Sequence, residues 1–136
     1  MTTIEETWTP QFSSWRHGGW YVDNIRYPSG AVGCVSRNYK DKKWRIVCDE
    51  RKGSHPGGEN DHTYPNRTAA ALAEKEIADE QWVDTRRHHN YEHYRKIADA
   101  LPDDVLRDVS RYALLDKTLH VALRDSARER NLWATQ

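Results

Sequence analysis

The chain has 136 residues, carries 21 Lys and Arg against 21 Asp and Glu, and has a mean hydropathy of -1.01. This length admits one domain with a modest core, or a small sheet unit with a helical appendage, and excludes two domains of ordinary size. A net charge of zero gives no global attraction to nucleic acid or to an anionic membrane, and no apolar run is long enough to span a bilayer.

Residues 1–19 carry aromatic side chains with no clear period, so we expect an extended arm that packs on the domain. The arm begins with neither the basic segment nor the apolar stretch of a signal peptide, which favours a cytoplasmic protein. Trp8 and Trp15, and Trp133 near the opposite end of the chain, are also candidates for binding a partner, because Trp is typical of interface hot spots.

The segment Trp20–Asp49 predicts a three-stranded antiparallel meander. Its three runs rich in Trp, Tyr, Val and Ile are separated by Pro28-Ser29-Gly30 and by a turn over residues 39–43. A turn centred on Asp41 places Cys34 opposite Cys48 and Ser36 opposite Ile46. Because side chains alternate between the faces of a strand, one face is then expected to be the core face. Its members are Tyr21, Ile25, Tyr27, Val32, Cys34, Trp44, Ile46 and Cys48. The outer face is expected to hold Trp20, Val22, Asn24, Arg26, Val35, Arg37, Arg45 and Val47.

The second half of the chain predicts helices. A loop over residues 50–65 ends before Asn66, a good N-cap for a helix over residues 67–82 that would cover the core face. Apolar periodicity predicts further helices ending before Pro102, opening at Asp103 and beginning near Lys117. We therefore predict an α+β fold, in which a three-stranded antiparallel β-meander is covered by a helix and followed by a C-terminal helical hairpin or small bundle. The expected segments are an arm over 1–19, a β-β-β-α unit over 20–84 and a helical extension over 85–136.

One pentapeptide, from His89 to His93, matches the H-x-x-E-H pattern of zinc enzymes. The helix to which it belongs is better explained by burial of Tyr91 and Tyr94, which leaves both histidines in solvent. The chain contains neither a nucleophile elbow nor a phosphate-binding loop. We therefore expect a protein that is not an enzyme and that needs neither a cofactor nor a metal.

Positive charge is concentrated in the predicted sheet, where residues 20–52 contain eight basic and four acidic side chains. A small antiparallel sheet can enter the major groove of DNA, where Arg reads guanine, Asn reads adenine and Lys contacts phosphates. A merely solvated sheet face is the alternative interpretation. The candidate nucleic-acid-binding residues are Trp20, Asn24, Arg26, Arg37, Lys40, Lys42, Lys43 and Arg45.

Residues 20–82 resemble the arm-site DNA-binding domain of tyrosine-family phage integrases. The likeness rests on the strand opening Lys43-Trp44-Arg45-Ile46 and on residues 63–70, TYPNRTAA, which combine an aromatic, a helix cap, Arg and an Ala-rich helix start. This resemblance implies DNA contacts from the sheet, carried over to Arg26, Arg37 and Arg45. The sequence departs from the family in its long loop over residues 50–65 and leaves no room for a catalytic integrase domain, so strand cleavage is not implied.

Two functions of different classes follow from these observations. The first is a small accessory protein, encoded by a phage or plasmid, that binds DNA or RNA through the outer sheet face and a homodimer or protein partner through its C-terminal helices. The second is a protein-binding regulator or inhibitor, such as an anti-defence protein of a mobile element, that acts through its aromatic arm and helices. Loss of salt-dependent nucleic-acid binding on substitution of the sheet arginines separates the two.

Overall fold

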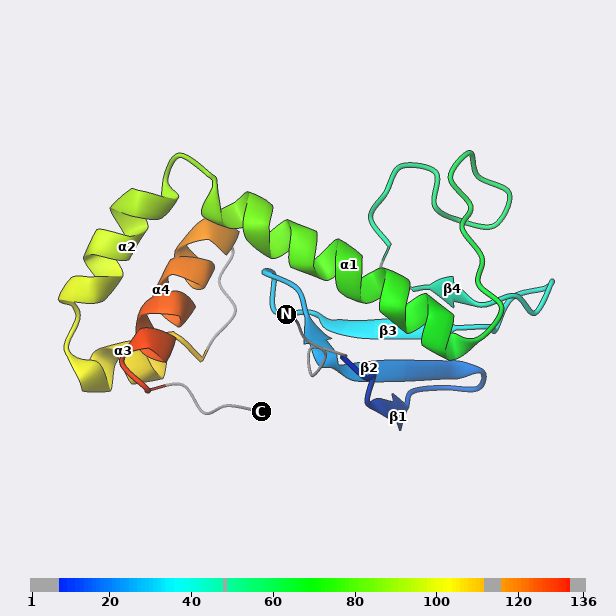
Figure 1. Cartoon of the computed structure of the whole chain (residues 1–136), viewed down its shortest axis with the longest axis horizontal. Helices are drawn as coiled ribbons and strands as arrows, with labels where there is room; N and C mark the ends of the chain where they lie inside the picture. The colour runs from blue at the N-terminus through cyan, green and yellow to red at the C-terminus, as the bar shows by residue number, and fades with distance from the viewer. Residues whose placement is uncertain (1–7, 48, 112–115, 133–136) are drawn as a thin grey trace, which may run out of the picture. The chain divides into compact units, whose positions relative to one another are not determined.

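The structure is a computed structural model that describes residues 8–47, 49–111 and 116–132, and it has the predicted α+β class (Figure 1). One four-stranded antiparallel sheet has the order β1-β2-β3-β4. Within the described residues, no helix is both long and apolar enough to cross a membrane. The strands are β1 (Phe12–Ser14), β2 (Gly19–Arg26), β3 (Val32–Ser36) and β4 (Arg45–Ile46), and the helices are α1 (Arg67–Arg86), α2 (Tyr91–Ala100), α3 (Asp103–Val109) and α4 (Lys117–Glu129).

The chain divides into two compact units. The first contains residues up to Ile25 together with Val32–Glu76, and therefore most of the sheet and the first half of α1. The second contains Arg26–Ala31 and the residues from Ile77 onward, and therefore the second half of α1 and the helices α2 to α4. Helix α1 thus contributes to both units. The sequence analysis placed the whole helix in one segment, the β-β-β-α unit over residues 20–84.

The sheet has a fourth strand where the sequence predicted only an extended arm. Strand β1 pairs with β2 so that Phe12 lies opposite Val22 and Ser14 opposite Trp20. The Ser13 hydroxyl donates to the Asp23 carboxylate at 2.8 Å, and the Asp23 N–H donates to the Gln11 carbonyl at 2.7 Å. The prediction missed this strand because QFSS shows no alternation of polar and apolar residues.

The predicted pairing between the last two strands is wrong by one residue. In the structure Val35 lies opposite Ile46 and Ser36 lies opposite Arg45. Because a slip of one residue exchanges the two faces of a strand, Val35 and Ile46 share a face and Arg45 moves to the other. Val35, predicted to face solvent, is fully buried. The Cys34 carbonyl accepts the Val47 N–H at 2.9 Å. Cys48, the predicted partner of Cys34, lies outside the described residues.

Strand β2 also departs from strict alternation. Val22 and Ile25 are both buried although they are three residues apart, while Tyr21, predicted in the core, is 37% exposed. A face assignment with period two therefore fails on β2.

The first half of α1 packs on the sheet within the first unit. Asn66 caps the helix as predicted, because its side-chain oxygen accepts the Ala69 N–H at 2.8 Å. Glu74 is fully buried, and its carboxylate accepts the Cys34 N–H at 3.0 and 3.3 Å. Ala70 and Ala71 are fully buried beside it, so small side chains allow α1 to approach the strands closely.

Gly33 lies at this contact, and replacing it with alanine tests how tightly α1 packs. An added Cβ would stand 2.8 Å from the Ile25 Cβ and 3.0 Å from the Glu74 carboxylate. We expect Gly33→Ala to lower the free energy of unfolding by about 1–3 kcal/mol, because overpacked cores force their neighbours apart. Denaturant titration measures this change, and stability equal to the wild type would show that α1 sits farther from β3.

The second unit has helix boundaries close to those predicted. Pro102 precedes α3, and Asp116 caps α4 by accepting the Leu119 N–H at 3.1 Å. A small core of Ala98, Leu106, Leu123 and Ala127 joins α2, α3 and α4. Ile97, an apolar residue of α2, is 44% exposed.

Arg130 ties two of these helices together. It follows α4 and donates to the carbonyls of Ala98 and Leu101 at 2.8 and 2.6 Å, the last turn of α2 and the residue after it. Carbonyl groups at a helix C-terminus have no partner within the helix, and a cation there also opposes the helix dipole. The helical unit is therefore held by polar contacts as well as by its small core.

Candidate nucleic-acid interface

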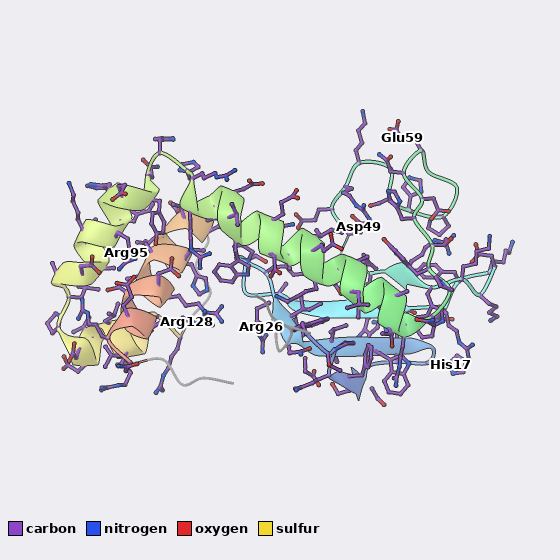
Figure 2. The ribbon with its side chains drawn as sticks, in the orientation of Figure 1. His17, Arg26, Asp49, Glu59, Arg95 and Arg128 are labelled. Atoms are coloured by element: carbon purple, nitrogen blue, oxygen red, sulfur yellow. The ribbon has the colours of Figure 1, made fainter. Side chains whose placement is uncertain are left out.

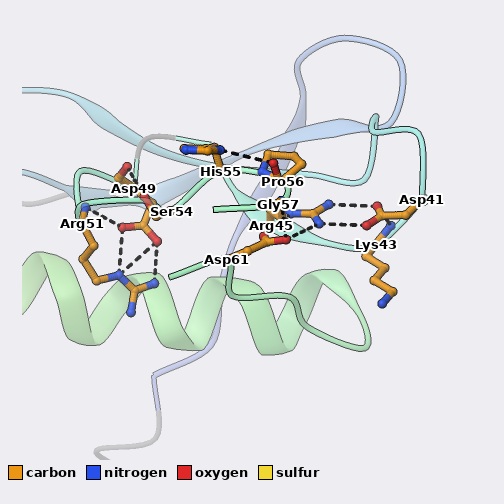
Figure 3. Close-up of polar contacts among 10 residues, drawn as sticks. All are labelled: Asp41, Lys43, Arg45, Asp49, Arg51, Ser54, His55, Pro56, Gly57 and Asp61. Atoms are coloured by element: carbon orange, nitrogen blue, oxygen red, sulfur yellow. Dashed lines mark hydrogen bonds and ion pairs between the residues drawn. The ribbon is translucent and has the colours of Figure 1, made fainter. Parts of the chain in front are cut away.

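A buried arginine organises the loops at one end of the sheet (Figure 3). Arg45 is 4% exposed, although the sequence predicted it on the solvent-facing side. Its guanidinium donates to both carboxylate oxygens of Asp41 at 2.9 and 2.8 Å, and to both of Asp61 at 2.7 and 2.9 Å. The guanidinium also lies 4.8 Å from the centre of the Tyr39 ring. We call this group, Asp41, Arg45 and Asp61, the arginine clamp.

The clamp changes the titration of its members. Hydrogen bonds from Arg45 hold the pKa of Asp41 well below its usual range and lower the pKa of Asp61 to about 2. The two carboxylates in turn raise the pKa of Arg45. Burial raises the pKa of the Tyr39 hydroxyl, an effect that the positive charge of Arg45 opposes. All three members of the clamp are therefore charged at neutral pH.

The clamp also anchors the loop between β4 and α1. The Gly57 N–H donates to the Asp61 carboxylate at 3.2 Å, so the same aspartate holds both Arg45 and the loop backbone. Nearby, Arg51 hydrogen-bonds the Asp49 carboxylate, and the Ser54 hydroxyl donates to the Asp49 carbonyl at 2.9 Å. These contacts give definite structure to a segment whose Gly and Pro content predicted only an exposed loop.

Exposed positive side chains gather around the clamp. The connection from β3 to β4 carries Arg37, Lys40, Lys42 and Lys43, all of them exposed. Asp41 is the one acidic residue between Arg37 and Trp44, and Arg45 occupies both of its oxygens. Arg45 carries one positive charge and holds two carboxylates, so the arginine clamp has a net charge of -1, which the four cations of this connection outnumber.

The turn before β2 adds two residues that the sequence analysis did not select. Gly18 adopts a φ of +75°, and its carbonyl accepts the Arg37 N–H at 2.9 Å and the Ser36 hydroxyl at 3.2 Å. The turn that contains Arg16 and His17 therefore lies against the start of the β3–β4 connection; Figure 2 labels His17. The signal in the sequence was His17-Gly18-Gly19, a turn between two strands, but its partner strand was not apparent. We call the combined group the basic turn cluster: Arg16, His17, Arg37, Lys40, Lys42 and Lys43.

Aromatic rings lie under two of these cations. The Arg16 guanidinium is 4.0 Å from the centre of the Trp15 ring, and that of Arg37 is 5.8 Å from the Trp44 ring. Neither arginine takes part in any of the ion pairs that join described residues. A guanidinium stacked on a ring keeps its N–H donors at the edge, where they can reach an anion.

Two other predicted contact residues are engaged within the protein. The Trp20 ring lies 4.4 Å from the Arg67 guanidinium, which also contacts the Phe12 ring at 4.2 Å. The Asn24 side chain accepts the Gln11 N–H at 3.0 Å and donates to the Thr9 carbonyl at 2.8 Å. Both side chains therefore hold β1 and the residues before it against the sheet, as Arg45 holds the loops.

The structure separates the remaining predicted residues. Arg26 is exposed and belongs to the second compact unit, whereas the basic turn cluster belongs to the first. In the arm, Trp8 lies 5.6 Å from the Lys75 ammonium, and Trp15 lies 6.0 Å from the Tyr21 ring. Both side chains are half-buried, and their role in binding a partner stays a prediction. Trp133 lies outside the described residues.

The H-x-x-E-H pentapeptide does not lie on one helix. Helix α2 begins at Tyr91, so His89 precedes it, and the His89 ring stacks on His88 with centres 4.3 Å apart. His93 lies on α2 with its ring 5.9 Å from that of Tyr94. Two histidines four residues apart share a helix face only if both are helical. Among the residues that the structure describes, no group of three His, Cys, Asp or Glu side chains could hold a metal ion.

Comparison with known proteins adds no relative. The likeness to integrase arm-site domains rests on short motifs and stays a prediction. No protein-family model, curated protein or solved structure matches this chain.

Proposed function

We propose that this protein binds nucleic acid through the basic turn cluster, by contacts to the phosphate backbone. The observation that carries the proposal is that the β3–β4 connection exposes Arg37, Lys40, Lys42 and Lys43, four positive charges against the single net negative charge of the arginine clamp. Affinity for a phosphate backbone comes mainly from such cations, through release of condensed counterions, and it requires no pocket.

This proposal differs from groove reading by a sheet face. Contacts within the chain engage the side chains of Trp20, Asn24 and Arg45. The side chains that would read base edges are therefore not available together on one face of the sheet. What remains is a set of cations on turns at one end of the sheet. Phosphate contacts of this kind position a protein without selecting a sequence, so the binding should depend strongly on salt and weakly on sequence.

Replacing Lys40, Lys42 and Lys43 together with glutamine tests the proposal. We expect the slope of log affinity against log salt to become shallower by about 3 for the duplex DNA and by about 2 for the single-stranded RNA, because each lost phosphate contact contributes about 0.9 and about 0.7, respectively. Affinity at about 0.1 M salt should fall at least on the order of a hundredfold. Fluorescence anisotropy with a labelled duplex DNA and a labelled single-stranded RNA, between about 50 and 200 mM salt, measures both quantities.

The matched control removes the same charge elsewhere. Lys52, Lys96 and Lys117 are exposed and lie outside the basic turn cluster, so their triple replacement with glutamine should leave the slope nearly unchanged. A wild-type protein that binds neither probe at low salt would overturn the proposal. Equal losses of affinity in the cluster variant and in the control variant would overturn it as well, since binding would then depend only on the total charge of the protein.

A further inference from the structure

A second group of positive charges surrounds Trp82 in the second compact unit. The Trp82 ring lies 5.4 Å from the Arg86 guanidinium and 5.0 Å from that of Arg124. The indole N–H donates to the Arg26 carbonyl at 2.7 Å, which fixes the backbone of Arg26 beside the tryptophan. Arg128 follows Arg124 by one helical turn on α4. We call Arg26, Arg86, Arg124 and Arg128 the arginine cluster; Figure 2 labels Arg26 and Arg128.

The acidic residues of α4 are paired with arginines, one of which, Arg86, belongs to the cluster. Asp125 accepts two hydrogen bonds from Arg86, at 2.8 and 2.9 Å, and a third from the Tyr91 hydroxyl at 2.6 Å. Glu129 accepts from Arg95 on α2 at 2.6 Å. Helix α4 therefore directs its carboxylates toward α2 and the end of α1, and carries Arg124 and Arg128 on a different part of its surface.

The cations of this cluster repel one another. Burial, together with the positive charges of Arg128, Arg26 and Arg86, lowers the pKa of Arg124 to about 10, while the charge of Asp125 opposes this shift. A guanidinium ordinarily has a pKa above 12, so the fold holds this one at an electrostatic cost. Groups kept at such a cost are often found where a ligand of opposite charge removes it.

We infer that the arginine cluster is a second contact for the phosphate backbone of a nucleic acid, on the unit that does not carry the basic turn cluster. The cluster collects guanidinium groups from β2, α1 and α4; Arg86 on α1 is paired with Asp125, so the contact is assigned to the exposed Arg26 and Arg128. A guanidinium matches the oxygens of a phosphate with paired N–H donors, and a nucleic acid presents phosphates in a row. The inference rests on the proposed function, and it adds a second site with its own test.

Replacing Arg26 and Arg128 with glutamine tests the inference. Both are exposed, so their replacement should leave the thermal unfolding temperature nearly unchanged. We expect the salt slope for duplex DNA and for RNA to become shallower by about 2, and the affinity at about 0.1 M salt to fall on the order of tenfold or more. The matched control is Arg107→Gln with Arg111→Gln, two exposed arginines of the same unit outside the cluster, which should change neither quantity.

The outcomes separate this inference from the proposed function. If the lysine triple variant loses affinity and R26Q/R128Q does not, the arginine cluster is no contact and the basic turn cluster stands. If R26Q/R128Q loses affinity and the lysine variant does not, the proposed site fails and the arginine cluster stands. Binding of labelled poly-glutamate with equal or higher affinity than DNA, lost in R26Q/R128Q, would assign the cluster to an acidic protein segment and overturn the inference.

Discussion

Arg45→Ala is expected to lower the free energy of unfolding by about 3 kcal/mol, because removing one partner of a buried ionic group leaves the others without compensation. The side chain of Arg45 is 5% exposed and holds Asp41 and Asp61, which come from the connections on either side of β4. Without it, two carboxylates face each other and both connections lose their common anchor. Chemical denaturation measures the change.

Acid titration of the same variant identifies the cause. The folded protein holds the pKa of Asp61 at about 2, below the value near 4 expected in the unfolded chain. A carboxylate with a lowered pKa stabilises the fold above its unfolded pKa, and this contribution is lost as pH falls toward the folded value. Wild-type stability should therefore decline from about pH 4 downward, and Arg45→Ala should show a weaker decline. Arg37→Ala, an exposed arginine on the same connection, should behave like the wild type within about 0.5 kcal/mol.

Unchanged stability in Arg45→Ala would show that the clamp does not stabilise the fold. If the variant lost stability but kept the pH dependence of the wild type, the loss would come from packing and not from the ion pairs. Arg45→Lys gives an intermediate case. A lysine keeps the charge but cannot make paired contacts with two carboxylates, so part of the stability should be lost.

Glu74→Ala is expected to cost a similar amount, about 3 kcal/mol, for a different reason. The Glu74 carboxylate is fully buried between α1 and β3 and accepts the Cys34 N–H. Its removal leaves a buried backbone donor without this acceptor and opens a void beside Gly33. Hydrogen exchange at Cys34 and chemical denaturation together measure both consequences.

Two further variants serve as controls for Glu74→Ala. Glu74→Gln keeps an acceptor oxygen at the same place and should cost markedly less than alanine. Glu76→Ala removes an exposed carboxylate two residues farther along α1 and should change the free energy of unfolding by less than about 0.5 kcal/mol. If Glu74→Ala behaved like Glu76→Ala, the contact with Cys34 would not stabilise the packing of α1 on the sheet.

The sequence by itself determined the helical part of the fold. Asn66 and Asp116 are caps whose side chains accept N–H groups within three residues, and Pro102 ends one helix and precedes another. Such signals act over one turn of chain, so they can be read without knowledge of the tertiary structure. The exposure of the lysines at residues 40–43 was also predictable, because a turn with this composition has few ways to be buried.

Only the tertiary structure decided which positive charges are available. The face on which Arg45 lies depends on a register that differs from the predicted one by a single residue, and its burial depends on Asp61, sixteen residues away in a loop without periodicity. The position of Arg16 depends in the same way on a backbone contact between Gly18 and Arg37. Alternation gives the two faces of a strand, but strand pairing and loop contacts between distant residues decide which face is covered.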